Sequence, residues 1–201
     1  MKLYYSPGAC SLSPHIVSRE AGIALQLEQV DHRDKKTKSG EDFWSINPKG
    51  QVPVLDTDDG QRFTEVPVIL QYLGDQKPAS GLVPAAGTTD RYRVQEWLNF
   101  VASELHKSYI PLFRPSTPDD YKKQLRKNIG KRLELVDKHL AGKQYLMGDT
   151  FTAADAYLFT VMRWSRAADI DLGQWPNIKA YFDRVADRPK VKEAMQAEGL
   201  Q

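Results

Sequence analysis

The chain has 201 residues, 41% of them hydrophobic, which is enough to bury a substantial core as one large domain or two small ones. Its 28 basic and 26 acidic residues leave a net charge of only +2, which argues against a nucleic-acid-binding surface. One cysteine excludes an internal disulfide, and no apolar run approaches the roughly 18 residues of a membrane-spanning helix. We expect a cytoplasmic protein with no membrane or nucleic-acid partner.

Strand and helix signals alternate in the first part of the chain. The expected elements are, in order, a strand at 2–6, a helix at 11–21, a strand at 25–31, a helical turn at 41–46, two strands within 50–65 around an Asp-Asp-Gly turn, and a helix at 67–75. The order β-α-β-α-β-β-α predicts a small α/β domain.

The amino-acid composition of the sequence changes after residue 77. Residues 77–89 are rich in Pro, Gly, Ala and Thr and are typical of an interdomain connection. Beyond them only helical signals occur, over 90–112, 117–140, 152–169 and 176–198, the last with a break at Arg188-Pro189. We expect an α/β domain at 1–80, a linker at 81–89 and an all-helical domain at 90–201.

One helix start in the second half carries a sharp signal. Thr152 stands at the N-cap position and Asp155 three residues later, an aspartate version of the capping box. The following residues, AYLFTVMRW, are apolar nearly all round. We expect this helix to be the buried centre of the helical domain.

Cys10 lies just before the first predicted helix. Unpaired backbone N–H groups and the positive end of the helix dipole favour a thiolate there, so we expect its pKa to fall below the usual value of about 8.5. The same N–H groups can instead hold the thiolate of a ligand. Free cysteines are also among the most buried residues, so an inert core cysteine remains the alternative.

Two further positions combine backbone and side-chain features suited to a ligand. Pro53 stands at the very start of a strand, where a cis peptide would leave the Val52 N–H and C=O free to pair with an extended peptide. Glu65-Val66 stands where a strand gives way to a helix, so Glu65 offers a carboxylate to an ammonium and the helix start offers N–H groups to a carboxylate. An ordinary edge proline and a capping glutamate are the alternatives.

A polar face runs along the first helix after the linker, through Gln95, Asn99, Ser103 and His106 at spacings of four, four and three. Such a face is usually only solvated, but a His-Lys pair near a thiol would stabilise an anion. The other histidines are scattered without ligand partners at metal spacing, so we expect no metal.

Several stretches together resemble the glutathione S-transferases, in particular the bacterial beta class. They are SPGACSL, NPKGQVPVL, the TE of residues 64 and 65, WLNFVASELHK, PLFRP, TAADAYLF and AEGL, and they cover essentially the whole chain in the right order. The resemblance implies a thioredoxin-like N-terminal domain, an all-helical C-terminal domain, a homodimer, and glutathione as a co-substrate with no permanently bound cofactor.

The resemblance also implies roles for individual residues. Cys10, Ser11 and His106 would act on the thiol of glutathione, and Pro53 would be cis. The implied glutathione-binding residues are Cys10, Lys35, Val52, Pro53, Glu65, Val66, Asn99, Ser103, Glu104, Leu105, His106 and Lys107, with Asn99 reaching in from the second subunit. Position 66 is often Ser, Asn or Gly in such enzymes, so Val66 lacks a side-chain hydrogen bond and we expect somewhat weaker glutathione binding.

The expected activity is conjugation of glutathione to a hydrophobic electrophile. We place the electrophile between the domains, with Tyr109, Phe113 and Trp164 as apolar walls. Two alternatives stay open. One is a mainly reductive enzyme, acting in thiol-disulfide exchange or peroxide reduction through a Cys10 mixed disulfide. The other is a non-enzymatic binding or regulatory protein on the same fold.

Overall fold

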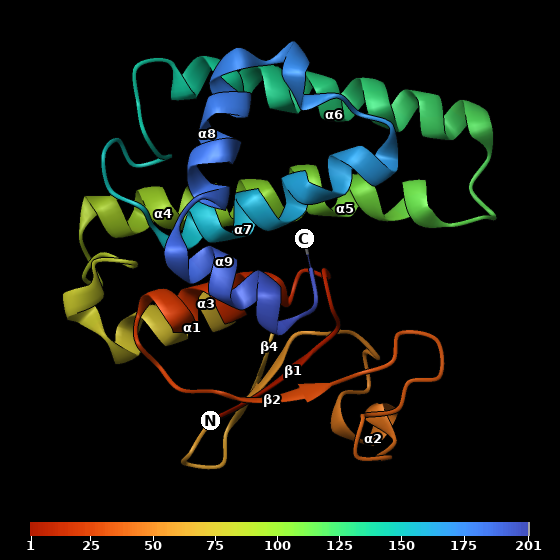
Figure 1. Ribbon diagram of the computed structural model, residues 1–201, viewed down its shortest axis with the longest axis vertical. Coiled ribbons are helices and arrows are strands. Elements are labelled where there is room, and N and C mark those ends of the chain that lie inside the picture. The colour runs from red at the N-terminus through yellow and green to blue at the C-terminus, as the bar shows by residue number, and fades with distance from the viewer. Residues whose placement is uncertain (201) are drawn as a thin grey trace. The chain divides into compact units, whose positions relative to one another are not determined.

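The computed structural model describes residues 1–200 of the chain. These residues form two compact units, one of residues 1–83 with the C-terminal residues from 188 onward, the other of residues 84–187. We call them the first unit and the helical unit. Their elements (Figure 1) are β1 (Lys2–Tyr5), α1 (Leu12–Glu20), β2 (Gln26–Gln29), α2 (Phe43–Ile46), β3 (Val54–Asp56), β4 (Arg62–Thr64), α3 (Val66–Gln76), η1 (Pro78–Ser80), α4 (Thr89–Phe100), η2 (Val101–His106), α5 (Lys107–Tyr109), η3 (Ile110–Phe113), α6 (Asp119–Leu140), α7 (Ala153–Met162), η4 (Arg163–Ala168), η5 (Leu172–Gln174), α8 (Pro176–Ala186) and α9 (Pro189–Ala197).

The first unit is built on a mixed sheet of order β2-β1-β3-β4. Strand β1 runs parallel to β2 and antiparallel to β3, and β4 is antiparallel to β3. Helices α1 and α3 pack together on one side of this sheet, and α9 packs against α1 (Figure 1). The β-α-β-α-β-β-α order confirms the predicted thioredoxin-like fold.

The periodicity of α1 and α3 explains which faces they bury. Leu12, Ile16 and Val17 of α1 are fully buried, and α3 buries its own apolar stripe, including Leu70 and Leu73. These residues recur at the three- and four-residue spacing of one helical face, so the predicted core of the first unit is confirmed.

The helical unit surrounds helix α7. All ten residues of α7 are buried, which confirms the prediction that this apolar helix lies at the centre, and α4, α8 and η2 pack against it. The predicted helix at 90–112 is one continuous helical path with three geometries: α4 gives way to the π-helical η2, then to α5 and to the 3-10 segment η3. A π-helical stretch inside an α-helix is often found at a functional position.

The predicted capping box at the start of α7 is present. The Asp155 carboxylate accepts hydrogen bonds from the backbone N–H and the hydroxyl of Thr152, both at 2.8 Å, and from the Leu146 N–H at 2.9 Å. The Tyr181 hydroxyl donates a further bond at 3.1 Å. Burial outweighs these bonds and raises the pKa of Asp155 to about 6.

The C-terminal helix α9 does not belong to the helical unit. It packs along α1 of the first unit, and the Arg188 guanidinium just before it makes hydrogen bonds of 2.7 and 2.8 Å to the two carboxylate oxygens of Glu20. The compact units therefore divide the chain differently from the sequence domains, which end at residue 80 and begin at residue 90. The predicted break at Arg188-Pro189 is the point where the chain returns to the first unit.

Candidate functional site

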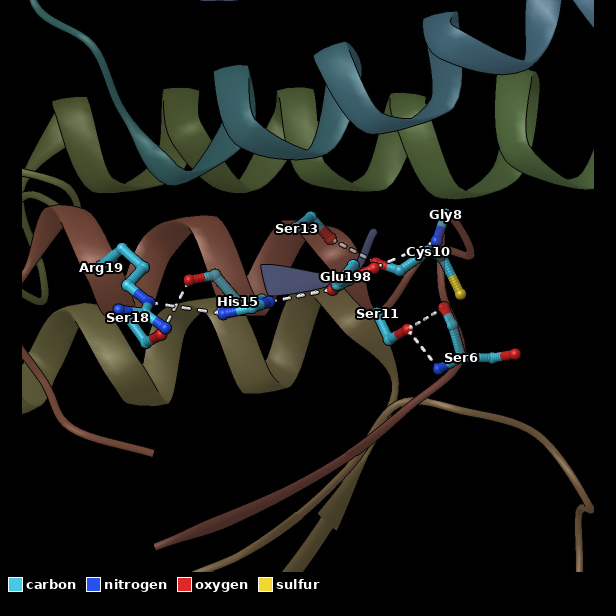
Figure 2. A network of polar contacts seen from close by, with 9 residues as sticks. All are labelled: Ser6, Gly8, Cys10, Ser11, Ser13, His15, Ser18, Arg19 and Glu198. Atoms are coloured by element: carbon cyan, nitrogen blue, oxygen red, sulfur yellow. Dashed lines mark hydrogen bonds and ion pairs between the residues drawn. The ribbon is translucent and has the colours of Figure 1, made fainter. Parts of the chain in front are cut away.

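Cys10 stands two residues before α1, in the connection that follows β1. Its side chain is almost fully buried, and its Sγ donates a hydrogen bond of 3.4 Å to the carbonyl oxygen of Val52. The cysteine therefore lies against the Val52-Pro53 segment. Cys10 and this segment are both predicted to contact the same ligand. Figure 2 shows Cys10 at the end of the loop that runs from Ser6 to α1.

The expected low pKa of Cys10 is wrong. Burial raises the pKa of the thiol to about 12, although the N–H groups of Cys10 and Ser11 at the helix start lower it as anticipated. The local effect of the helix start is thus present but smaller than the cost of burying a thiolate.

Ser11 is tied into the same loop. Its hydroxyl donates to the Ser6 carbonyl at 3.2 Å and accepts from the Ser6 N–H at 3.1 Å, and its side chain is fully buried. The hydroxyl therefore holds the end of β1 to the start of α1. Its predicted catalytic role stays a prediction, and the observed contacts are structural.

Pro53 has the cis geometry that the resemblance implies, and Lys35 lies close to the segment before it. The Val52-Pro53 peptide bond is cis. The ammonium of Lys35 donates to the Gly50 carbonyl at 2.8 Å and lies 6.0 Å from the centre of the Trp44 ring. This contact places a cation beside the segment that leads into the cis proline.

Glu65 directly precedes α3 and is engaged by a cation. Its Oε1 accepts a hydrogen bond of 2.6 Å from the ammonium of Lys49, and the side chains of Glu65 and Lys49 are 64% and 52% exposed. The carboxylate is therefore reachable from solvent and already binds an ammonium group. The Val66 N–H, at the first position of α3, has no hydrogen-bond acceptor among residues 1–200.

Backbone strain coincides with two of these positions. Within residues 1–200 only Lys35, Glu65 and Asp169 have a positive φ without being glycine, at 52°, 69° and 56°. Such conformations cost about 1 to 3 kcal/mol each and cluster at ligand-binding positions. Two of the three strained residues belong to the predicted glutathione site.

In the helical unit, His106 ends the π-helical segment and is held by an aromatic cluster. Its Nδ1 lies 2.6 Å from the Tyr157 hydroxyl, and its ring meets Trp164 edge to face with centroids 5.0 Å apart. The Phe113 ring meets the same Trp164 ring edge to face with centroids 6.3 Å apart, and Phe113 is 45% exposed. His106, Phe113 and Trp164 are therefore brought together.

Other predicted residues of the helical unit are placed differently. Asn99, Ser103 and Lys107 are exposed, with the Ser103 hydroxyl donating to the Asn99 carbonyl at 2.9 Å. Glu104 is held by the Arg132 guanidinium at 2.7 Å.

Two predicted contact residues of the helical unit are fully buried. Leu105 and Tyr109 have no exposed surface, and the Tyr109 hydroxyl lies 2.6 Å from the Ser165 Oγ. Both residues therefore pack into the core of the unit. The Tyr109 ring also meets the Trp164 ring edge to face with centroids 6.1 Å apart, so its role as a wall for the electrophile stays a prediction. Helical spacing puts Leu105 and Tyr109 on one face of the chain but does not say whether a neighbouring element covers that face.

Sequence reasoning missed several residues that contact the predicted ones in each unit. Lys49 pairs with Glu65, Trp44 covers Gly50, and Tyr157 holds His106. A Cβ on Gly50 would lie 2.5 Å from the Trp44 ring, so glycine is required there. The stretch NPKG around Lys49 and Gly50 was the available signal for the first two.

No group of three or more His, Cys, Asp or Glu side chains in residues 1–200 is arranged to hold a metal ion. Within the same residues, no helix has both the length and the apolar character needed to cross a membrane.

The thioredoxin-like sheet with a cysteine before α1 and a cis proline before β3, followed in the chain by an all-helical unit, defines the class of glutathione transferase folds. Comparison with known proteins agrees. Residues 8–76 match the glutathione S-transferase N-terminal domain family and residues 100–189 match the glutathione S-transferase C-terminal domain family. A curated relative, glutathione S-transferase GstA of Escherichia coli O157:H7, is 46% identical, and the match covers 100% of each chain.

Two solved structures give the same result. A sphingomonad glutathione S-transferase complexed with glutathione is 46% identical with a TM-score of 0.96, and the beta-class glutathione S-transferase of Sphingomonas chungbukensis is 44% identical with a TM-score of 0.96. Both matches cover 100% of each chain. The present chain belongs to the glutathione S-transferase family, and its predicted resemblance to the beta class is confirmed.

Proposed function

We propose that this protein is an enzyme that joins the thiol of glutathione to hydrophobic electrophiles such as aryl halides or activated alkenes. Family membership is the main support, and the first unit adds a set of complementary groups. Glu65 offers a carboxylate to the α-ammonium of the γ-glutamyl end, and the Val66 N–H is available for its α-carboxylate. The backbone of Val52 pairs with the cysteinyl part, and Lys35 takes the glycyl carboxylate.

The chemical step is a nucleophilic substitution or addition at carbon, with sulfur as the nucleophile. Glutathione gives up its thiol proton to solvent and its sulfur attacks the electrophilic carbon. With an aryl halide the carbon–halogen bond breaks and halide leaves; with an activated alkene the carbon–carbon π bond breaks and the second carbon takes a proton from solvent. Backbone N–H groups at the start of α1 stabilise the thiolate in this scheme. His106, held by Tyr157, and the rings of Phe113 and Trp164 are the groups that we assign to the electrophile.

The burial of Cys10, which raises the pKa of its thiol, favours conjugation over redox work as the main activity. A thiol whose pKa is raised to about 12 has almost no thiolate at pH 7, and only the thiolate attacks a disulfide. We assign Cys10 a hydrogen-bonding role beside the glutathione sulfur and a side activity in thiol-disulfide exchange.

The test compares the wild type with Cys10→Ala. We measure glutathione-dependent conjugation of a chloronitrobenzene, glutathione-dependent disulfide exchange, and glutathione affinity by calorimetry. We expect Cys10→Ala to retain most of the conjugation and to lose disulfide exchange. Binding of glutathione to both proteins without conjugation by either would refute the proposed function and favour a reductase or a binding protein.

Two further expectations belong to this proposal. We infer that the enzyme is a homodimer, as the resemblance implies, and light scattering after size-exclusion chromatography tests this. The cytoplasmic location predicted from the single cysteine stays a prediction.

A further inference from the structure

The C-terminal residues after α9 contact the loop that precedes Cys10 (Figure 2). The Glu198 side chain is fully buried there: its Oε2 accepts a hydrogen bond of 3.0 Å from the Gly8 N–H, and its Oε1 accepts one of 2.9 Å from His15 Nδ1. Gly8 and His15 precede Glu198 by 190 and 183 residues. A carboxylate from the far end of the chain is thus built into the loop before α1.

The Gly8 contact fixes one peptide plane of a tight turn. The Ala9 N–H donates to the Ser6 carbonyl at 3.0 Å, Pro7 is the second residue of the turn, and Gly8 has a φ of 71°. These features define a type II turn, which differs from type I by a flip of the central peptide. The N–H of that central peptide belongs to Gly8, so Glu198 holds the turn in its type II form.

The His15 contact fixes the direction of the carboxylate. His15 is fully enclosed, and its Nε2 lies 3.4 Å from the Arg19 Nε. A guanidinium N–H can only donate, so Nε2 accepts, and the proton of a neutral imidazole lies on Nδ1 and is donated to Glu198. Arg19, His15 and Glu198 therefore form a chain of hydrogen bonds along α1 that ends at the Gly8 N–H.

A second contact at the same turn comes from Leu200. A Cβ added to Gly8 would lie 3.4 Å from the Leu200 Cδ2, so the C-terminal residues also cover the turn by packing. The chain leaves this turn through Ala9 and reaches Cys10 and Ser11 within two or three residues. Any change in the central peptide of the turn therefore reorients the N–H groups that face the Cys10 sulfur.

We propose that Glu198 is a positioning residue of the thiol site, holding the Pro7-Gly8 peptide so that the Cys10 and Ser11 N–H groups point at the sulfur. The role in catalysis rests on the proposed function. Glu198 contacts neither substrate nor sulfur, and it acts through the turn. The neighbouring Glu20–Arg188 pair joins the other ends of α1 and α9, at the end of α1 remote from Cys10.

The test compares Glu198→Gln with Glu20→Gln as a matched control. The carboxamide in the first variant keeps the size of the side chain but offers only one acceptor oxygen, so the His15 N–H and the Gly8 N–H cannot both be satisfied. Glu20→Gln weakens the same helix pair away from the turn. On the full chain we measure urea unfolding, kcat and the KM for glutathione, and the pH profile of Cys10 alkylation by iodoacetamide.

We expect both variants to unfold at lower urea concentration than the wild type. Only Glu198→Gln should lower kcat/KM for glutathione, by about tenfold. In that variant alone the alkylation profile should also move to higher pH, because the Cys10 and Ser11 N–H groups, which lower the thiol pKa, no longer point at the sulfur. The same changes in Glu20→Gln, or an unchanged profile and kcat/KM in Glu198→Gln, would show that Glu198 only stabilises the fold.

Two further measurements keep the test decisive. If Glu198→Gln does not fold, Gly8→Ala disturbs the turn directly, since alanine disfavours a φ of 71°, and the same shift in the alkylation profile is expected. A wild-type profile in Gly8→Ala would overturn the proposal. Alkylation needs no glutathione, so a wild type without transferase activity would refute the proposed function while the alkylation profiles still decide the role of Glu198.

Discussion

Asp155 in the helical unit and Glu198 in the first unit are both buried carboxylates, but they obtain their hydrogen-bond donors differently. Asp155 accepts from Thr152 and Leu146, three and nine residues away, and from Tyr181. Among residues 1–200, the Glu198 carboxylate accepts from Gly8 and His15, both more than 180 positions earlier. Local donors serve to start one helix, whereas distant donors join the C-terminal residues to the loop of the candidate site. Every buried carboxylate needs hydrogen-bond donors. Burial therefore does not show whether the carboxylate caps a helix or joins distant parts of the chain.

The largest effect should come from removing the local carboxylate. Asp155→Ala leaves the Leu146 and Thr152 N–H groups buried without an acceptor, and each such group costs about 1 to 3 kcal/mol. We expect the free energy of unfolding to fall by about 4 kcal/mol, measured by urea denaturation. The exposed Asp149→Ala should change it by less than about 0.5 kcal/mol. A loss of similar size in both variants would contradict the capping role.

The pH dependence of the same carboxylate gives a second test. Burial raises the pKa of Asp155 from 3.8 to about 6, so the folded protein holds this proton more tightly than the unfolded chain. The resulting stabilisation is fully present below pH 3.8 and is lost as the pH rises through 6. The difference in unfolding free energy between wild type and Asp155→Asn should therefore fall by about 2 kcal/mol from about pH 4 to about pH 7. Other titrating groups cancel in this difference, and a flat difference would mean that the folded pKa is ordinary.

The two carboxylates also show how far sequence reasoning reaches. The capping box of Thr152 and Asp155 is visible in the sequence because its partners are three residues apart, and the buried faces of α1 and α3 follow from helical spacing. The Glu198 contacts are invisible because nothing local relates Glu198 to Gly8. The pKa of Cys10 was mispredicted for the same reason, since the helix start is a local feature but burial depends on residues such as Val52 that lie far away in sequence.

Leu105 and Tyr109 show a second limit. The spacing of a helix gives the relative directions of its side chains, and the polar residues Asn99, Ser103 and Lys107 are exposed as their face suggests. Which side of the same helix a neighbour covers is decided by packing in the whole unit. For that reason the burial of Leu105 and Tyr109 had to come from the structure.

In the helical unit, a hydrogen bond between two residues far apart in the sequence holds the predicted site residue His106. His106 and Tyr157 are 51 residues apart and 2.6 Å from ring nitrogen to hydroxyl. Tyr157→Phe removes this hydrogen bond, and we expect kcat/KM for conjugation to fall about tenfold because His106 loses its orientation. Tyr181→Phe is the matched control, since it removes a hydroxyl bonded to Asp155 in the same unit. It should lower stability and leave kcat/KM unchanged, and an equal loss of kcat/KM in both variants would contradict a specific role of Tyr157.

The smallest effect should come from an exposed ion pair, because solvent weakens the attraction between its charges at any separation in the sequence. The Lys49 ammonium lies 2.6 Å from the Glu65 carboxylate, which is the group assigned to the ammonium of glutathione. Lys49→Met removes this internal competitor, so the KM for glutathione should fall about threefold, in keeping with the roughly 0.2 to 1 kcal/mol of exposed ion pairs. The difference should shrink as salt is added, because salt screens exposed charges.

Lys123→Met is the control for the Lys49 variant. Lys123 forms an exposed pair of 3.3 Å with Asp120 in the helical unit, so its replacement changes the net charge equally and should leave the KM for glutathione unchanged. A higher KM in Lys49→Met alone would mean that Lys49 contacts glutathione itself, and the competition would then be excluded. Equal changes in both variants would reflect net charge rather than the Glu65 carboxylate. Only a lower KM confined to Lys49→Met fits a site that its own lysine occupies before the ligand arrives.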